Sequence, residues 1–231
     1  MIGNITIQIQ AEVISIIVVS LVIFAFVFVV NKKVKTANIY EKPKGILLIA
    51  TIFVEALAKL TNDNVNHKSA ANYAPYIAVL ALYLLFSNFS GLLGLSQPTK
   101  NYSVTLTLAL ITFVLIQRAS IKTVGITGYI KSFFEPSPFL FIMNFFSKIA
   151  PIISMSVRLF GNITSGSILM LMVYGFTAYL SGLFPIIGSI NFIGPLIAPF
   201  LHFYFDLFVG AIQMFIFISL TTVFIGIELS Q

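Results

Sequence analysis

Long apolar runs alternate with short polar connections along most of this chain. The runs at 13–30, 73–95 and 102–117 come close to the roughly 20 residues that a helix needs to cross a bilayer. Two later runs, 138–180 and 196–229, are much longer than one crossing requires. Because a helix rises about 1.5 Å per residue, such helices must tilt strongly, lie partly in the membrane plane or break. The pattern predicts five membrane-spanning helices.

A shorter apolar run at 46–60 carries Glu55 and Lys59, which share one face of a helix. It is predicted to lie at the cytoplasmic membrane surface rather than to span. The two long final helices are expected to be tilted and to form a hairpin, and Pro151 offers one possible bend.

No soluble domain and no internal repeat is visible, so the chain is interpreted as a single all-α membrane domain. Residues 1–72 form a first span with a basic loop and a surface helix. Residues 73–137 form two further spans with an inner loop, and residues 138–231 form the long hairpin.

The composition supports a membrane protein, because 58% of the residues are hydrophobic and only 9% are charged. Soluble domains carry about a quarter charged residues. The chain has no cysteine, which excludes disulfides and thiolate metal sites. Its net charge of +6 does not indicate nucleic-acid binding, since the basic residues lie mainly in the connections.

The distribution of these basic residues predicts the topology. Five lysines occupy the connection 31–45, three basic residues occupy 118–137, and Lys100 is the single cation of the connection 96–101. Loops rich in lysine and arginine stay in the cytoplasm. The N-terminus is therefore predicted to be outside and the C-terminus in the cytoplasm.

Arg158 stands inside an apolar segment, where a cation costs roughly 3 kcal/mol or more to insert. Helical spacing places Ser154, Asn162 and Ser165 on the same face. Small residues such as Gly161 also favour close helix packing, which explains the stripe but not the arginine. Alternatives for the arginine are snorkelling to a headgroup or a structural ion pair.

The last helix has a polar stripe of its own, formed by His202, Asp206, Gly210 and Gln213. A carboxylate inside the membrane is by default functional, and Asp206 is suited to relay protons. The alternatives are a static ion pair between Asp206 and Arg158, and an interfacial position for His202. No hydrolase, redox or metal motif is visible, so ion translocation is the leading class of function.

Two motifs carry a resemblance to a known family. The sequences "SVRLFGNITSGS" at 156–167 and "AIQMFIFISLTTVF" at 211–224 resemble subunit a of the F-type ATP synthase. The family pattern has Arg-Leu-Phe/Tyr-Gly-Asn on the penultimate helix and Gln-x-Phe-Ile-Phe on the last. Stretches at 87–110 and 136–162 also look like the family, and the resemblance covers most of the chain beyond residue 73.

The resemblance implies a non-catalytic stator subunit, without a cofactor or metal, that provides two aqueous half-channels for protons. Arg158 would face a carboxylate of each rotor c-ring subunit and separate the half-channels. Asn162 and Gln213 would line the site, and Asp206, with His202, would carry proton entry. The implied partners are the c-ring, peripheral-stalk subunit b, the rest of the complex and the lipid bilayer.

The chain departs from the family at positions that often hold titratable residues, here Ser167, Asn144 and Asn101. We therefore expect water to carry much of the path, with Ser154 and Ser167 as polar lining. A secondary transporter and a proton-channel subunit of a respiratory complex remain as alternatives. A bacterial plasma membrane is favoured over a mitochondrial inner membrane.

Overall fold

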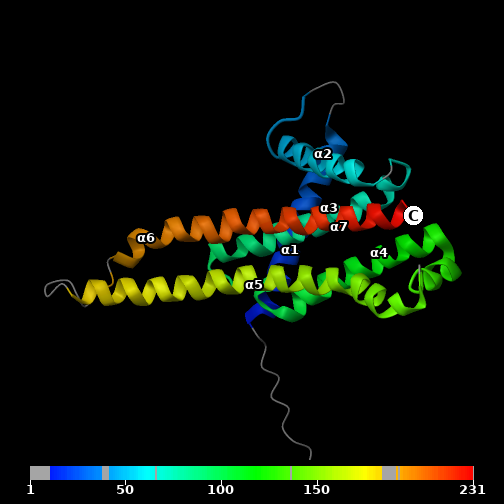
Figure 1. The fold of residues 1–231 in the computed structure, drawn as a ribbon. Helices are drawn as coiled ribbons and strands as arrows, with labels where there is room; N and C mark the ends of the chain where they lie inside the picture. The colour runs from blue at the N-terminus through cyan, green and yellow to red at the C-terminus, as the bar shows by residue number, and fades with distance from the viewer. Residues whose placement is uncertain are drawn as a thin grey trace, which may run out of the picture.

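The computed structural model describes residues 11–37, 42–65, 67–135, 137–183, 191 and 193–230. The predicted outer residues 1–10, part of the first basic loop and most of the connection between the last two helices lie outside this set. All regular elements in the described part are helices (Figure 1). Five of its segments are long and apolar enough to cross a membrane, which confirms the predicted all-α membrane fold.

The spanning segments follow the predicted order. They are α1 (Ala11–Thr36), α3 (His67–Phe89), α4 (Tyr102–Lys131), α5 (Phe141–Gly182) and a last segment made of α6 (Ile193–His202), η4 (Phe203–Val209) and α7 (Gly210–Leu229). Short 3-10 turns, η1 (Ser90–Leu93), η2 (Pro98–Lys100) and η3 (Pro138–Leu140), lie in the connections.

The predicted surface helix is present as α2 (Ile46–Asn64) and is not among the candidate spans. It lies beside α7 on one side of the long hairpin (Figure 1) and packs its apolar face on α3 and α7 through Phe53, Leu57 and Leu60. Its end lies so close to α7 that a Cβ at Gly226 would collide with the backbone oxygen of Asn64.

The prediction that the third span ends at Arg118 and leads into a loop is wrong. The α4 helix continues to Lys131, with a break at Gly125, where φ is 74° and ψ is 168°. Helix formation depends on backbone hydrogen bonds rather than on hydropathy, so Arg118 and Lys122 do not end it. Glycine adopts this positive φ without the steric penalty that a Cβ brings.

The long hairpin is also present, and α5 runs through Pro151 without interruption over 42 residues, or about 63 Å. The last segment runs antiparallel to α5 along most of this length (Figure 1). It is not one regular helix, because η4 is a π-helix inserted between α6 and α7. Such insertions are frequent at functional sites.

The main hydrophobic core is formed where four helices meet. Leu84 of α3, Ala109 of α4, Leu159 of α5 and Phe217 of α7 are all buried there. This packing buries one side of α5 and turns its other side outward, which fixes the face on which Arg158 lies.

Candidate functional site

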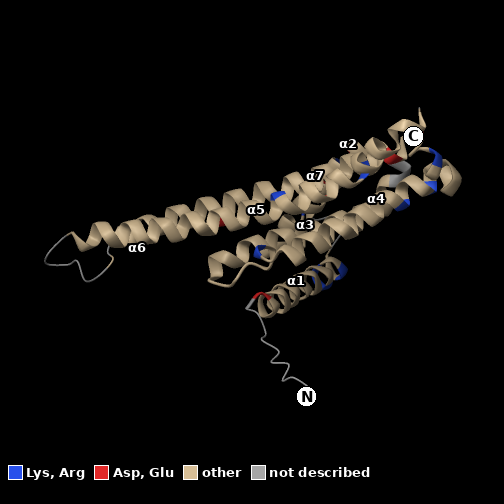
Figure 2. Cartoon of the chain, turned by 60° about the horizontal axis from the view of Figure 1, so that its bottom comes forward, with Lys and Arg blue, Asp and Glu red and all other residues tan. Residues whose placement is uncertain are grey.

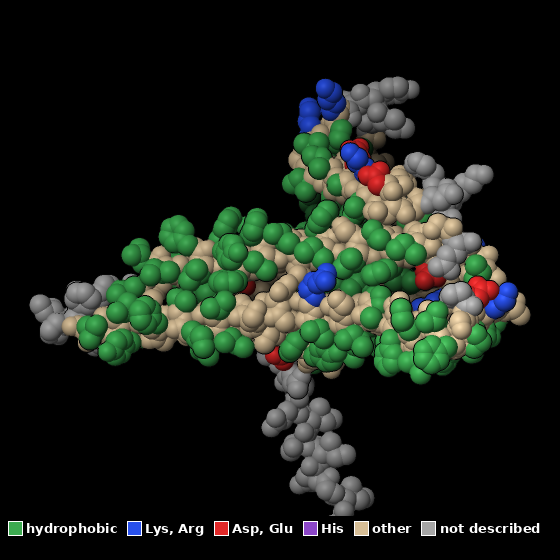
Figure 3. Space-filling model, viewed as in Figure 1, with side chains coloured by type: hydrophobic (Ala, Val, Ile, Leu, Met, Phe, Trp, Pro, Cys, Tyr) green, Lys and Arg blue, Asp and Glu red, His purple; other side chains and the backbone are tan. Residues whose placement is uncertain are grey.

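Arg158 lies on the outward side of α5. Ser154, Arg158 and Asn162 are exposed, whereas the neighbouring Met155 and Leu159 are buried. Figure 2 shows the charged residues concentrated near the helix ends, with little charge along the middle of the hairpin. Figure 3 shows hydrophobic side chains spread along the length of α5 and α7 on this face.

Among the described residues, Arg158 forms no ion pair; the pairs present are Lys131–Glu135 and His202–Asp206. The alternative of a static pair between Arg158 and Asp206 is therefore wrong. The reason is axial distance: Phe205, next to Asp206, packs on Gly166, which is eight residues or about 12 Å further along α5 than Arg158.

Asp206 faces a cavity of about 370 Å³ between the α3–α4 connection, α5 and the last segment. We call it the Asp206 cavity. Its polar lining comes from all three regions and includes Asn88, Ser96, Gln97, Lys100, Asn162, Ser167, Tyr174, His202, Asp206 and Gln213. A water molecule occupies about 30 Å³ in the liquid, so the volume is sufficient for several.

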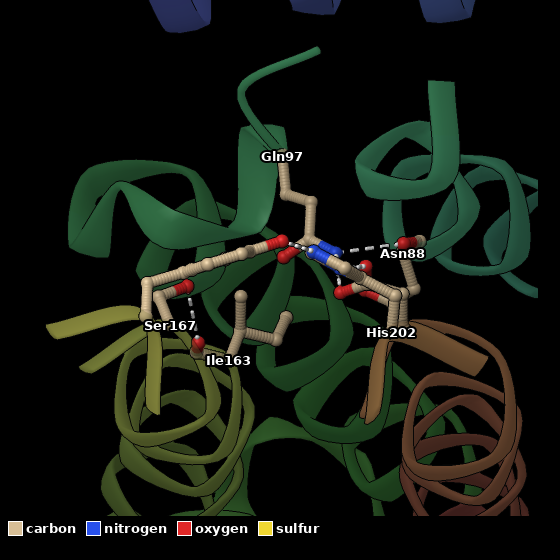
Figure 4. Close-up of polar contacts among 7 residues, drawn as sticks. Asn88, Gln97, Ile163, Ser167 and His202 are labelled. Atoms are coloured by element: carbon tan, nitrogen blue, oxygen red, sulfur yellow. Dashed lines mark hydrogen bonds and ion pairs between the residues drawn. The ribbon is translucent and has the colours of Figure 1, made fainter. Parts of the chain in front are cut away.

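Both carboxylate oxygens of Asp206 have partners. Gln97 Nε2 donates to Oδ1 at 3.1 Å and to the carbonyl oxygen of Asn88 at 2.9 Å (Figure 4). His202 Nδ1 lies 2.7 Å from Oδ2. On the far side of the ring, His202 Nε2 lies 3.2 Å from the hydroxyl of Tyr174. Four side chains thus form one hydrogen-bonded chain into the cavity.

The π-helix places Asp206 in this network. Asp206 lies within η4, and Gly210 begins α7 directly after it. Asn88 Nδ2 donates to the carbonyl oxygen of Gly210 at 2.9 Å. A Cβ at Gly210 would lie 2.9 Å from the Asn88 Cβ, so only glycine permits this approach without a shift. The contact therefore holds the C-terminal end of the π-helix against α3.

Asn162 and Gln213 join α5 to α7 one turn from the arginine. Asn162 Nδ2 donates to Gln213 Oε1 at 2.6 Å, and the Gln213 side chain is almost fully buried. Both residues line the Asp206 cavity.

The other predicted residues fall in different places. Ser167 lines the Asp206 cavity, and its hydroxyl donates to the carbonyl oxygen of Ile163 at 2.9 Å (Figure 4). Asn101 is the N-cap of α4, where its side chain accepts from the backbone N–H of Ser103, and it does not line the cavity. Ser154 lines no described cavity.

A second cavity of about 350 Å³ opens at the other end of the hairpin. We call it the Glu228 cavity. It lies between α4, α5 and α7, and its polar lining is Gln117, Ser132, Asn144, Ser147, Lys148 and Glu228. Along α5, the lining of the Glu228 cavity ends at Met155, and the lining of the Asp206 cavity begins at Asn162. Arg158 lies between them and lines neither cavity.

Sequence reasoning missed Asn88, Gln97, Tyr174 and Glu228. Asn88 and Gln97 are amides at the end of a span and in its connection, and an amide there is ordinary. Only the chain reversal between α3 and α4 brings them to Asp206. Glu228 had a signal, because it is an acid in an apolar helix end. Among the described residues, no cluster of histidine and acidic residues could hold a metal ion.

Comparison with known proteins agrees with the motifs. The family described as "ATP synthase A chain" matches residues 13–226. The ATP synthase subunit a of Priestia megaterium is 31% identical over 205 residues, which covers 85% of this chain and 84% of that protein. Its counterpart in Moorella thermoacetica is 28% identical and covers 95% and 91%. The "ATP synthase subunit a, sodium ion specific" of Propionigenium modestum is 35% identical over 170 residues, 66% of this chain and 53% of that protein.

Proposed function

This chain belongs to the ATP synthase A chain family, and from that premise we propose that Arg158 is the residue that couples ion flow to rotation. The chain is the ion-translocating, non-catalytic membrane subunit of an F-type ATP synthase. The alternatives of a secondary transporter and of a respiratory-complex subunit are therefore set aside. The residues and partners below are our proposal.

The position of Arg158 is the observation that best supports its proposed role in coupling ion flow to rotation. It is exposed on the outward side of a largely apolar helix, and it lies between the two cavities. A guanidinium in contact with lipid hydrocarbon is strongly disfavoured, so a partner with negative charge is expected to cover it. That partner is the rotor ring, with one carboxylate for each of its subunits.

The two cavities act as half-channels for protons. The Asp206 cavity opens to the outside and the Glu228 cavity to the cytoplasm, in keeping with the basic residues of the connections at 31–45 and 118–137. A proton must leave one cavity on a rotor carboxylate and reach the other after rotation. Arg158 attracts the ionised carboxylate in a low-dielectric interface and thereby blocks a direct path.

Asp206 and His202 carry protons into the outer half-channel. Their contact at 2.7 Å allows the proton to move between a carboxylate and an imidazole, which are both suited to accept it. Asn162 and Gln213 form the polar edge of this half-channel next to Arg158. The complex resides in a bacterial plasma membrane, with the N-terminus outside, the C-terminus in the cytoplasm and subunit b of the peripheral stalk as a further partner.

Arg158→Ala tests the proposal in membrane vesicles that contain the assembled complex. We expect ATP-driven proton pumping to be lost while the complex still assembles. Val157→Ala is the matched control, since Val157 is the exposed neighbour on the same helix. Normal pumping by Arg158→Ala would show that the arginine is structural.

A further inference from the structure

Glu228 has an unusual environment for a carboxylate. It lies in the last turn of α7, and its Oε2 atom is enclosed by protein without a hydrogen-bond partner among the described residues. Buried polar atoms in folded proteins almost always have partners, so an exception calls for an explanation.

Helix stability does not supply that explanation. The carbonyl groups at a helix C-terminus carry partial negative charge, and an acidic side chain there is unfavourable. A glutamine at this position would keep the shape of the side chain and avoid the repulsion. Glu228 is thus placed against the local preference of its helix.

The charged and phenolic groups nearest to Glu228 have other partners. Lys148 is the other charged residue that lines the cavity, and its Nζ bonds instead to Ser132 Oγ at 3.2 Å and lies 4.5 Å from the centre of the Tyr129 ring. Tyr129 is close enough to Glu228 for their charges to interact, but its hydroxyl donates to Gln117 Oε1 at 2.6 Å. Neither neighbour forms a hydrogen bond or ion pair with the Glu228 carboxylate.

The cavity connects Glu228 to the region of Arg158. It extends along α5 to Met155, less than one turn before Arg158, and its volume of about 350 Å³ is sufficient for several water molecules. The other polar lining residues, apart from Lys148, are amides and hydroxyls that do not titrate near neutral pH. Glu228 is therefore the one carboxylate of this cavity's described lining.

We propose that Glu228 is the proton-exchanging residue of the cytoplasmic half-channel. The carboxylate takes a proton from a hydronium ion at the cytoplasmic side, which is left as water, and becomes a neutral acid. It then releases this proton toward the rotor carboxylate through water in the cavity, and its own charge is restored. The net change is the movement of one proton, and ATP synthesis uses the same steps in reverse. This inference rests on the proposed function.

Three variants test the role of Glu228 in inverted membrane vesicles, where the cytoplasmic side faces the medium. Glu228→Gln keeps the size and removes the titration, and Glu228→Asp keeps the titration. Glu135→Gln is the control, because Glu135 is a nearby exposed acid paired with Lys131. The rate of ATP-driven proton pumping is measured over a range of medium pH and is divided by the amount of assembled complex.

We expect Glu228→Gln to pump roughly tenfold more slowly, because general acid–base groups give large effects but cavity water carries part of the flow. The rate should also fall more steeply as the medium pH rises, since protons in water become scarce. Glu228→Asp should recover much of the rate, and Glu135→Gln should match the parent. A structural role would not change the pH profile.

The inference is overturned if Glu228→Gln pumps at the parental rate with the parental pH profile, or if any loss only reflects less assembled complex. Arg158→Ala, measured in the same kind of vesicles, distinguishes failure of the role proposed for Glu228 from failure of the proposed function. Loss of pumping in Arg158→Ala with normal pumping in Glu228→Gln would reject the role of Glu228 alone. Normal pumping in Arg158→Ala would reject the proposed function on which it rests.

Discussion

Asn162 on α5 donates a hydrogen bond of 2.6 Å to Gln213 on α7, and this contact joins the two long helices next to the exposed Arg158. The acceptor is buried, whereas the donor lies on the outward face. The bond therefore holds the polar side chains that line the Asp206 cavity at a fixed position along α5, about one turn from Arg158.

This contact predicts that Asn162→Ala and Gln213→Ala are not independent. A typical hydrogen bond contributes about 1 kcal/mol, so the double variant should lose roughly that much less stability than the two single variants together. Thermal unfolding of the purified complex measures this difference. Strict additivity would mean that the bond does not form in the assembled protein.

Asp206→Asn should lower proton-driven ATP synthesis by roughly tenfold or more, because the amide cannot accept a proton. Asp206→Glu should retain a substantial part of the activity. ATP synthesis after an imposed pH jump is the measurement, with the amount of assembled complex as reference. Full synthesis by Asp206→Asn would remove Asp206 from the path.

The hydroxyl of Tyr174 lies 3.2 Å from His202 and is expected to orient its ring. Tyr174→Phe should slow proton entry less than His202→Ala does, because the imidazole itself remains. Tyr179→Phe is a matched control on the same helix, since Tyr179 is exposed there. A loss as large in Tyr179→Phe would show that the effect is not specific to the histidine contact.

Gly226→Ala should destabilise the packing of α2 on α7. Its Cβ would collide with the backbone oxygen of Asn64, and overpacking of this kind typically costs about 1–3 kcal/mol. Gly175→Ala is the control, because a Cβ built at Gly175 has no atom within 4 Å apart from its chain neighbours and the nearby backbone of its own helix. The yield and the thermal stability of the assembled complex should fall for Gly226→Ala only.

The absence of cysteine from the chain allows a direct test of the two cavities. Ser167→Cys places a thiol in the Asp206 cavity, and Ser147→Cys places one in the Glu228 cavity. A membrane-impermeant thiol reagent should reach Ser167→Cys from the outside and Ser147→Cys from the cytoplasmic side. Labelling of both from the same side would contradict two separate half-channels.

The spans and the main site could be predicted because they depend on local patterns. Apolar runs predicted the five spans, and helical spacing predicted that Ser154, Arg158 and Asn162 share one face. The 3.6-residue period also brought His202 next to Asp206. In each case the relevant partners lie within a few residues of one another in the sequence.

The missed features depend on the backbone or on distant contacts. Hydropathy treated Arg118 and Lys122 as the start of a loop, although a helix accommodates both. Nothing in the pattern of residues 203–209 indicated a π-helix. The bonds of Gln97 to Asp206 and of Asn88 to Gly210 join positions more than 100 residues apart, and only the tertiary packing brings them together.

Because of the π-helix at 203–209, the direction in which the polar residues of the last segment point depends on the backbone hydrogen-bond pattern as well as on residue type. An i→i+5 hydrogen bond encloses one residue more than the bond of an α-helix, so the bulge acts as a one-residue insertion. If the same residues formed a regular α-helix instead, everything on one side of the bulge would be turned by about 100°. His202 would then face away from the cavity that Gln213 lines, even though every polar residue of the stripe was still present.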